Sequence, residues 1–188
     1  MKVFIAGPRA VNSLNKDITD VLSRIIEKHL TVLVGDADGV DKMVQKYFAE
    51  SKYQNVYIYA CNGKARNNIG NWTVKNVEVP STVKGFDFYS RKDVQMAQDA
   101  DNGFMIWNGQ SKGTLNNIIN LTSQSKKTMI YLIPTEKIHC TDNLSDVERM
   151  AKSIGFETYT LYRKLCPKST ISTEIVGFEQ LSLSELFL

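Results

Sequence analysis

Three loops carry the residues whose types and spacing could bind a ligand. They lie at residues 7–9, 35–41 and 108–114, and each follows a short apolar run and precedes an amphipathic segment. Loops that leave the carboxyl ends of parallel strands gather at one edge of a sheet, where ligands bind near the change in strand order. We therefore expect all three loops to face a single crevice.

The loop at residues 108–114 is the best candidate for an anion site. Gly109 and Gly113 permit a close approach to the backbone. Ser111 and Thr114 supply hydroxyl groups, and the amides that begin the next helix would point at a bound phosphate. The spacing matches neither a P-loop nor a GxGxxG fingerprint, so it gives no support for hydrolysis of nucleoside triphosphates. The alternative is a tight turn capped by a threonine, without a ligand.

The loop at residues 35–41 crowds three carboxylates, Asp36, Asp38 and Asp41, into six positions. Such groups could accept hydrogen bonds from ribose hydroxyls or hold Mg²⁺ through water. Their spacing excludes an EF-hand. The alternative is that they serve as turn and capping residues.

Arg91 and Trp107 are candidates for contacts to a phosphate and a base. Arg91 lies in a predicted helix that leads into the strand before the third loop, so its guanidinium could reach a phosphate. The alternative is a solvated arginine paired with Asp93. Trp107 could stack on a base or belong to the core. The two histidines, His29 and His139, form no catalytic triad.

Short apolar runs alternate with amphipathic helical segments along the chain, which predicts parallel strands joined by right-handed crossovers. We expect an α/β fold, a Rossmann-like three-layer sandwich with an open, mainly parallel sheet of about five strands. Residues 62–85 could form a small hairpin or a flap. The predicted strands lie at residues 2–6, 31–34, 55–61, 103–107 and 128–133.

The composition changes after residue 134, so we divide the chain into a core at residues 1–134 and a C-terminal α+β appendage at residues 135–188. The pattern there predicts a helix at residues 144–154, a β-like segment at 157–165 and an apolar end at 181–188. Such an end would be exposed unless it met a partner subunit. We therefore expect the appendage to lie on the same core or at the interface of a homo-oligomer.

The composition excludes several classes of protein. With 188 residues, 43% hydrophobic residues and a net charge of +3, the chain is neither disordered nor strongly basic, and its scattered Lys and Arg argue against nucleic-acid binding. The three cysteines form no CxxC pair, which favours a reducing compartment and gives no metal site. We expect a cytoplasmic protein without a signal peptide or membrane helix.

The motifs occur in an order that resembles the SLOG superfamily of Rossmann-like nucleotide-binding domains, nearest to its YspA/YpsA-like branch. The resemblance covers about residues 1–134. More distantly, the chain is similar to the Lonely-guy nucleoside monophosphate phosphoribohydrolases. The residues that carry the resemblance are Phe4 to Arg9, Gly35 to Asp41, Arg91-Lys92 with Met96, Ala100-Asp101, and Gly109 to Thr114.

The resemblance implies a nucleotide site made of nine residues. The phosphate would lie on Gly109, Ser111, Gly113 and Thr114. Arg91 would correspond to the helix arginine of the hydrolases. The rest of the nucleotide pocket would be lined by Gly7, Arg9, Gly35 and Asp41.

One departure from the hydrolase pattern bears on activity. Where the phosphoribohydrolases place glutamates after Gly-Thr, this chain has Asn116 and Asn117, and a neutral amide cannot ionise to activate water or stabilise a ribosyl cation. We expect binding of a nucleotide or an ADP-ribose-type signal, without a cofactor and without catalysis. The alternative is an N-ribosyl hydrolase or deoxyribosyltransferase-like enzyme on nucleoside 5′-monophosphates, in which Asp41 or Asp101 supplies the carboxylate. DNA binding, as in the Smf/DprA branch, would need a basic strip that the sequence lacks.

Overall fold

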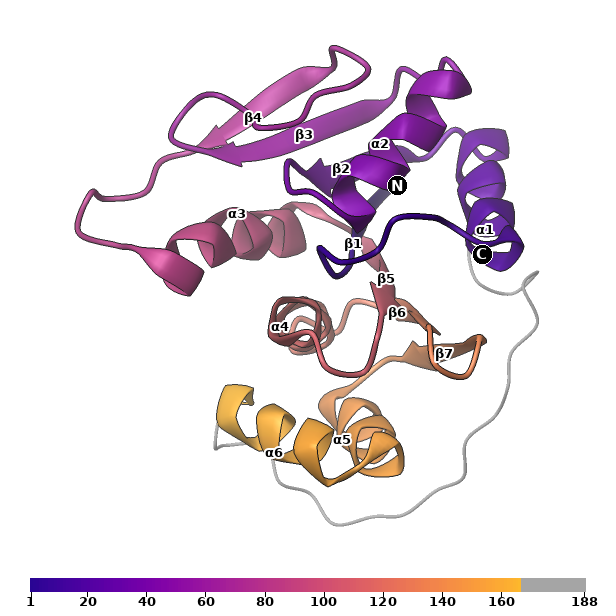
Figure 1. The fold of residues 1–188 in the computed structure, drawn as a ribbon, viewed down its shortest axis with the longest axis vertical. Helices are drawn as coiled ribbons and strands as arrows, with labels where there is room; N and C mark the ends of the chain where they lie inside the picture. Colours follow the sequence, from indigo (N-terminus) through magenta and orange to yellow (C-terminus); the bar gives the residue numbers. More distant parts are fainter. Residues whose placement is uncertain (167–188) are drawn as a thin grey trace.

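A seven-stranded sheet organises the chain (Figure 1). The computed structural model describes residues 1–166. The strand order is β4-β3-β2-β1-β5-β6-β7, and all neighbours are parallel except β6 and β7. The strands are β1 (Lys2–Ala6), β2 (Thr31–Gly35), β3 (Val56–Cys61), β4 (Thr73–Val77), β5 (Asn102–Trp107), β6 (Thr128–Leu132) and β7 (Lys137–Thr141).

Side chains that alternate along each strand create two cores, one on each face of the sheet. Val3 and Ile5 of β1 pack against α1 (Lys16–Glu27) and α2 (Val40–Glu50). Phe4, the residue between them, packs on the other face against α3 (Gly85–Asp99) and α4 (Lys112–Thr122). This arrangement is a three-layer α/β sandwich and confirms the predicted fold class.

The strand order reverses beside β1, the first strand of the chain. The chain builds β1, β2, β3 and β4 outward in one direction, and α3 then returns it so that β5 pairs with the free side of β1. Open α/β sheets bind ligands at such a reversal, outside the carboxyl ends of the strands. In this chain that place lies beyond Ala6 of β1 and Trp107 of β5.

The sheet has two strands more than the five expected. β4 forms within residues 62–85, where the sequence allowed a hairpin or a flap, and pairs parallel to β3 at the edge of the sheet. β7 pairs antiparallel to β6 at the opposite edge, directly after the turn that follows β6. Both are edge strands, and their residues are mostly half-buried or exposed, so neither shows the continuous apolar run of a central strand.

The segment predicted as β-like at residues 157–165 is helical instead. It forms α6 (Phe156–Leu165), which follows α5 (Leu144–Ile154) and packs against it. The Thr and Tyr residues of this segment favour strands locally. In the helix, however, Tyr159 and Tyr162 are three positions apart and stack with ring centroids 6.4 Å apart. Packing therefore overrides the local preference.

The described part of the C-terminal segment belongs to the same core as the rest. β7 extends the sheet, and buried residues of α5 and α6 join the apolar cluster of α3 and α4. The apolar end at residues 181–188, on which the expected homo-oligomer rests, lies outside the described residues. Among residues 1–166, no helix combines the length and apolar character that crossing a membrane requires.

Candidate functional site

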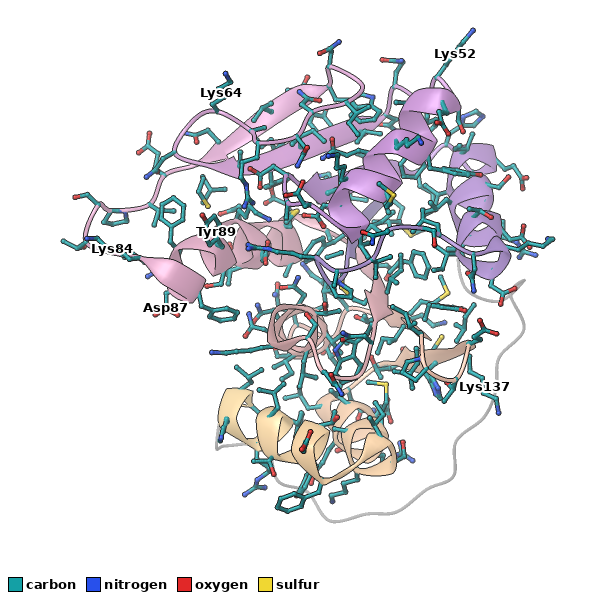
Figure 2. All side chains as sticks on the ribbon, in the orientation of Figure 1. Lys52, Lys64, Lys84, Asp87, Tyr89 and Lys137 are labelled. Carbon is teal, nitrogen blue, oxygen red and sulfur yellow. The ribbon has the colours of Figure 1, made fainter. Side chains whose placement is uncertain are left out.

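A cavity of about 610 Å³ opens at the carboxyl ends of β1 and β5, where the strand order reverses. Its floor is the end of β1, and its sides come from the loop before α2, the first half of α3 and the first turns of α4. Figure 2 shows Tyr89 at the same end of α3 as Lys84 and Asp87. The residues that line the cavity are Ala6, Gly7, Pro8, Arg9, Ala10, Ala37, Asp41, Gly85, Phe86, Tyr89, Ser90, Lys92, Asp93, Met96, Ser111, Lys112, Gly113, Thr114 and Asn117.

The structure brings six of the nine predicted site residues to this cavity. They come from all three loops that the sequence singled out, which therefore do share one crevice. The six are Gly7, Arg9, Asp41, Ser111, Gly113 and Thr114.

Three predicted residues lie elsewhere. Gly35 does not line the cavity. A Cβ placed on it would lie only 2.3 Å from Asp41 Oδ2, so the Asp41 side chain covers this glycine. Gly109 has a φ of +78° and faces the C-terminal helices, and its carbonyl accepts a hydrogen bond from Thr158 Oγ1 at 2.7 Å. Arg91 is exposed and lines a separate hollow, together with residues 82–84, 87, 90 and 94.

The first turns of α4, residues 111–117, form what we call the α4 wall. Ser111 is the N-cap of α4, and its Oγ accepts hydrogen bonds from Thr114 N at 3.4 Å and Thr114 Oγ1 at 3.0 Å. The amides of Lys112 and Gly113 come next, and the first amides of a helix have no acceptor within it. A Cβ placed on Gly113 would meet nothing within 4 Å. The start of α4 therefore faces open space.

The loop that leads into α4 is held by its own hydrogen bonds. Asn108 Oδ1 accepts from the amides of Gln110 at 3.1 Å and Ser111 at 2.8 Å. Trp107 is fully buried, and its Nε1 donates to the Ser111 carbonyl at 3.2 Å. Trp107 is thus a core residue that supports the helix start, and it is not available to stack on a base.

Asn117 lies one helical turn further along the α4 wall. It is only 3% exposed, and its Oδ1 has no hydrogen-bond partner among the described residues. Buried polar atoms are nearly always hydrogen-bonded, so each exception calls for an explanation. Asn116, the other asparagine after Gly-Thr, does not line the cavity.

Aromatic rings and cations surround the mouth of the cavity. Phe86 and Tyr89 of α3 are 39% and 38% exposed. Lys112 Nζ lies 4.0 Å from the centroid of the Phe86 ring. The guanidinium carbons of Arg9 and Arg66 lie 5.1 Å and 4.8 Å from the centroid of the Tyr89 ring. These cation–π contacts hold positive charge where a ligand would enter.

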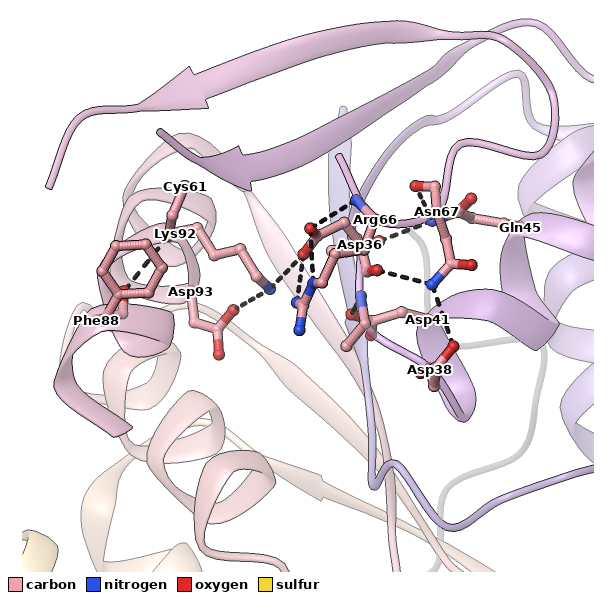
Figure 3. A network of polar contacts seen from close by, with 12 residues as sticks. Asp36, Asp38, Asp41, Gln45, Cys61, Arg66, Asn67, Phe88, Lys92 and Asp93 are labelled. Atoms are coloured by element: carbon pink, nitrogen blue, oxygen red, sulfur yellow. Dashed lines mark hydrogen bonds and ion pairs between the residues drawn. The ribbon is translucent and has the colours of Figure 1, made fainter. Parts of the chain in front are cut away.

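The opposite side of the cavity is lined by Asp41, Lys92 and Asp93, and with Asp36, which does not line the cavity, they form what we call the acid wall (Figure 3). Arg66 binds Asp36 through both ends of its guanidinium, with Nη2–Oδ1 at 2.7 Å and Nε–Oδ2 at 3.0 Å. Lys92 Nζ lies 2.8 Å from Asp93 Oδ1 and 4.0 Å from Asp36 Oδ1. These charges are paired with one another.

Burial and pairing shift the pKa values in the acid wall in opposite directions. Burial raises the pKa of Asp41 to about 6, although Lys92 acts to lower it. Burial would also raise the pKa of Asp36, but the hydrogen bonds from Arg66 outweigh it and the pKa lies below its usual value. Burial would lower the pKa of Lys92, but Asp93, Asp41 and Asp36 outweigh it and the pKa is raised. Lys92 therefore stays charged.

The segment between β3 and β4 is tied to the acid wall from outside. Asn67 Nδ2 donates to the Asp36 carbonyl at 2.9 Å, as Figure 3 shows. The fully buried Gln45 donates from Nε2 to the Gly35 carbonyl at 2.8 Å and accepts at Oε1 from the Ile69 amide at 3.1 Å. This insertion therefore positions the loop that carries Asp36 and Asp41.

Sequence reasoning missed Lys92, Arg66 and the two aromatic residues of α3. A signal for Lys92 was present, because Lys92 and Met96 are four positions apart and share one helix face. Met96 is apolar and buried, so its face of α3 had to point inward and bring Lys92 with it. Arg66 and Phe86 gave no comparable signal, since neither lies in a regular pattern next to a strand.

Comparison with known proteins assigns this chain to no family. No protein-family model matches the sequence, and no curated protein shows significant similarity to it. Within residues 1–166, no group of three or more His, Cys, Asp or Glu is arranged to hold a metal ion.

Proposed function

We propose that this chain binds a nucleotide or an ADP-ribose-type ligand in the cavity, with a phosphate at the first turn of α4. One observation carries the proposal. A single cavity is lined by the start of α4, by the cations Arg9 and Lys112, and by the half-exposed rings of Phe86 and Tyr89. The resemblance to the SLOG superfamily points to the same class of ligand.

The α4 wall supplies what a phosphate needs. The first amides of an α-helix have no internal acceptors, and the helix dipole places partial positive charge at the same end. Gly113 adds no side chain, and a Cβ at its position would meet no atom within 4 Å. The hydroxyls of Ser111 and Thr114 already bond to each other and can turn toward a phosphate oxygen.

The mouth of the cavity supplies contacts for the rest of a nucleotide. Phe86 and Tyr89 present apolar aromatic surface that a base can contact. Arg9 and Lys112 already lie over these rings, and a guanidinium or ammonium in that position attracts an anionic ligand. A phosphorylated nucleoside has both an aromatic base and a negative charge, so it would match this combination of exposed aromatic side chains and cations.

Gly113→Val tests the position of the phosphate. A branched side chain would fill the space in front of the α4 amides, so we expect affinity for phosphorylated ligands to fall at least about tenfold, or 1.4 kcal/mol. Isothermal titration calorimetry with nucleoside 5′-mono- and diphosphates and ADP-ribose measures this. Asn116→Val is the matched control, because Asn116 lies in the same turns of α4 but does not line the cavity. Unchanged binding to folded Gly113→Val would remove the α4 wall from the site.

A hydrolase is the second candidate, because two carboxylates line the same cavity. Asp41 has a pKa of about 6, within the range useful for proton transfer near neutral pH, and Asp93 lies beside it. We place hydrolysis second because Asp41 is only 5% exposed and its Oδ2 accepts a hydrogen bond from the Ala37 amide. We expect no more than trace release of base from nucleoside 5′-monophosphates. Robust release that disappears in Asp41→Asn would make this chain an N-ribosyl hydrolase.

The proposal includes a cytoplasmic homo-oligomer. Cys61, Cys140 and Cys166 are all free thiols, as expected in a reducing compartment. The apolar residues at positions 183–188 supply the chemistry of a subunit contact. Light scattering after size-exclusion chromatography gives the mass, and a monomer at micromolar concentration would contradict the oligomer.

A further inference from the structure

We infer that Asn117 recognises a sugar hydroxyl, so that the cavity selects a phosphorylated ribose over its deoxy counterpart. The inference rests on the proposed function and adds a specificity-determining residue to it. Its starting point is the buried amide of Asn117, whose Oδ1 has no partner among the described residues although the residue lies in the cavity wall.

The position of Asn117 on α4 matches the dimensions of a nucleotide. Gly113 and Asn117 are four positions apart, so they lie on one face of the helix about 6 Å apart along its axis. A phosphate at the first turn therefore has the amide one turn away from it. In a 5′-nucleotide the ribose hydroxyls are a few bonds from the phosphate, which is a separation of the same order.

The chemistry of an amide suits a hydroxyl. An asparagine offers one acceptor and two donors, and rotation about its last side-chain bond exchanges their positions. A hydroxyl both donates and accepts, so it can satisfy either end of the amide. A carboxylate at position 117 could only accept a hydrogen bond, whereas the amide can also donate one.

The charged side chains of the opposite wall already have partners within that wall. Lys92 is bound to Asp93 at 2.8 Å, and Asp41 accepts from the Ala37 amide at 3.2 Å. Asp36 is held by Arg66. Near the helix start, the Ser111 and Thr114 hydroxyls are the groups nearest to a phosphate. Asn117 differs from them, because it lines the cavity with a buried acceptor that no described residue satisfies.

Asn120 provides a matched control on the same helix. Its Nδ2 is also buried without a hydrogen-bond partner among the described residues, but Asn120 does not line the cavity. Replacing either asparagine by leucine removes a buried unsatisfied polar atom while nearly keeping the volume. We expect both variants to melt at the same temperature as the wild-type protein or higher. Only the change at Asn117 is expected to alter binding.

The test compares ribonucleoside 5′-monophosphates of the four common bases with their 2′-deoxy and 3′-deoxy forms by calorimetry. We expect the wild-type protein to prefer the ribonucleotide at least about tenfold over one deoxy form, which identifies the hydroxyl. In Asn117→Leu the preference disappears, because affinity for the ribonucleotide falls to that for the deoxy form. In Asn120→Leu the preference remains. Asn117→Ala serves as a second variant should the leucine disturb the fold.

Two results would overturn the inference. The first is an unchanged preference for ribose in Asn117→Leu and Asn117→Ala, and the second is an equal loss of affinity for both sugars, which would mean that Asn117 acts through shape. Either result leaves the proposed function intact, because nucleotides still bind. Failure of every nucleotide to bind the wild-type protein would instead contradict the proposed function, and the inference with it.

Discussion

The two walls of the cavity are built on opposite principles. On the acid wall each charged side chain is near an opposite charge, as in the pairs Asp36–Arg66 and Asp93–Lys92. On the α4 wall the first amides face open space, and Asn117 Oδ1 has no hydrogen-bond partner within residues 1–166. The comparison teaches that charged residues crowded beside a cavity can be occupied in holding its shape, whereas the unsatisfied neutral groups are the ones left for a ligand.

The two walls should also respond differently to substitution. Breaking a buried ion pair leaves an uncompensated charge and is strongly destabilising. Removing an unsatisfied polar atom is close to neutral or stabilising. Equivalent substitutions on the two walls should therefore change stability in opposite directions, and three predictions test this.

The largest effect is expected for Lys92→Met. Its side chain is 5% exposed and carries the only positive charge that touches both Asp93 and Asp36 among the described residues. Its loss would leave the Asp93 carboxylate without its ion-pair partner, so the free energy of unfolding should fall by roughly 3 to 5 kcal/mol. Urea denaturation measures this.

The control for that prediction is the neighbouring residue. Arg91→Met removes an equal charge from the exposed side of α3 and should change stability by no more than about 0.5 kcal/mol. A loss below about 1 kcal/mol in Lys92→Met would show that water, and not Lys92, compensates the carboxylates. The contrast between the walls would then fail.

The variant Asp41→Asn tests the acid wall through the pH dependence of stability. Burial raises the pKa of Asp41 from its ordinary value of 3.8 to about 6, so the folded protein keeps the proton over a range in which the unfolded chain releases it. Stability should therefore fall as the pH rises from about 4 to about 6 and then level off. The variant cannot ionise and lacks this decline.

The size of that effect follows from the pKa. A shift from 3.8 to about 6 corresponds to roughly 3 kcal/mol. The difference in unfolding free energy between Asp41→Asn and the wild-type protein should move in favour of the variant by that amount over the same pH range. Parallel curves for the two proteins, measured by denaturation at several pH values, would mean that Asp41 ionises normally in the folded state.

The smallest effects come from adding one methyl group to each wall. In Gly35→Ala the new Cβ would lie 2.3 Å from Asp41 Oδ2 and 2.5 Å from Lys92 Nζ, so these buried side chains must move, at a cost of about 1 to 3 kcal/mol. In Gly113→Ala the Cβ meets nothing, and the higher helix propensity of Ala should add up to about 1 kcal/mol. Thermal unfolding that changed in the same direction for both variants would contradict the comparison.

Much of the fold could be predicted from the sequence because it depends on local patterns. The short apolar runs that end at Gly7 and Gly35 are too short for helices and too apolar for surface loops. Once these strands are taken as parallel, their carboxyl ends must share an edge, and this brings Arg9, Asp41 and Ser111 to one cavity without any knowledge of the packing.

The edges of the sheet and the last helix could not be read in this way. β4 and β7 have no clear alternation because they are edge strands, and their pairing with β3 and β6 is a contact between segments. Residues 156–165 have strand-like composition, but packing against α5 and α4 makes them helical. Non-local contacts decide such segments.

The sequence by itself thus determined the alternation of strands and helices and the edge at which the three loops meet. Only the tertiary structure decided which residues of those loops face the cavity. Successive helix residues point about 100° apart, so the turn of α3 buries Lys92 and exposes Arg91. A positive φ at Gly109 likewise turns that residue toward α6. Directions of this kind depend on how whole elements pack, which no single loop specifies.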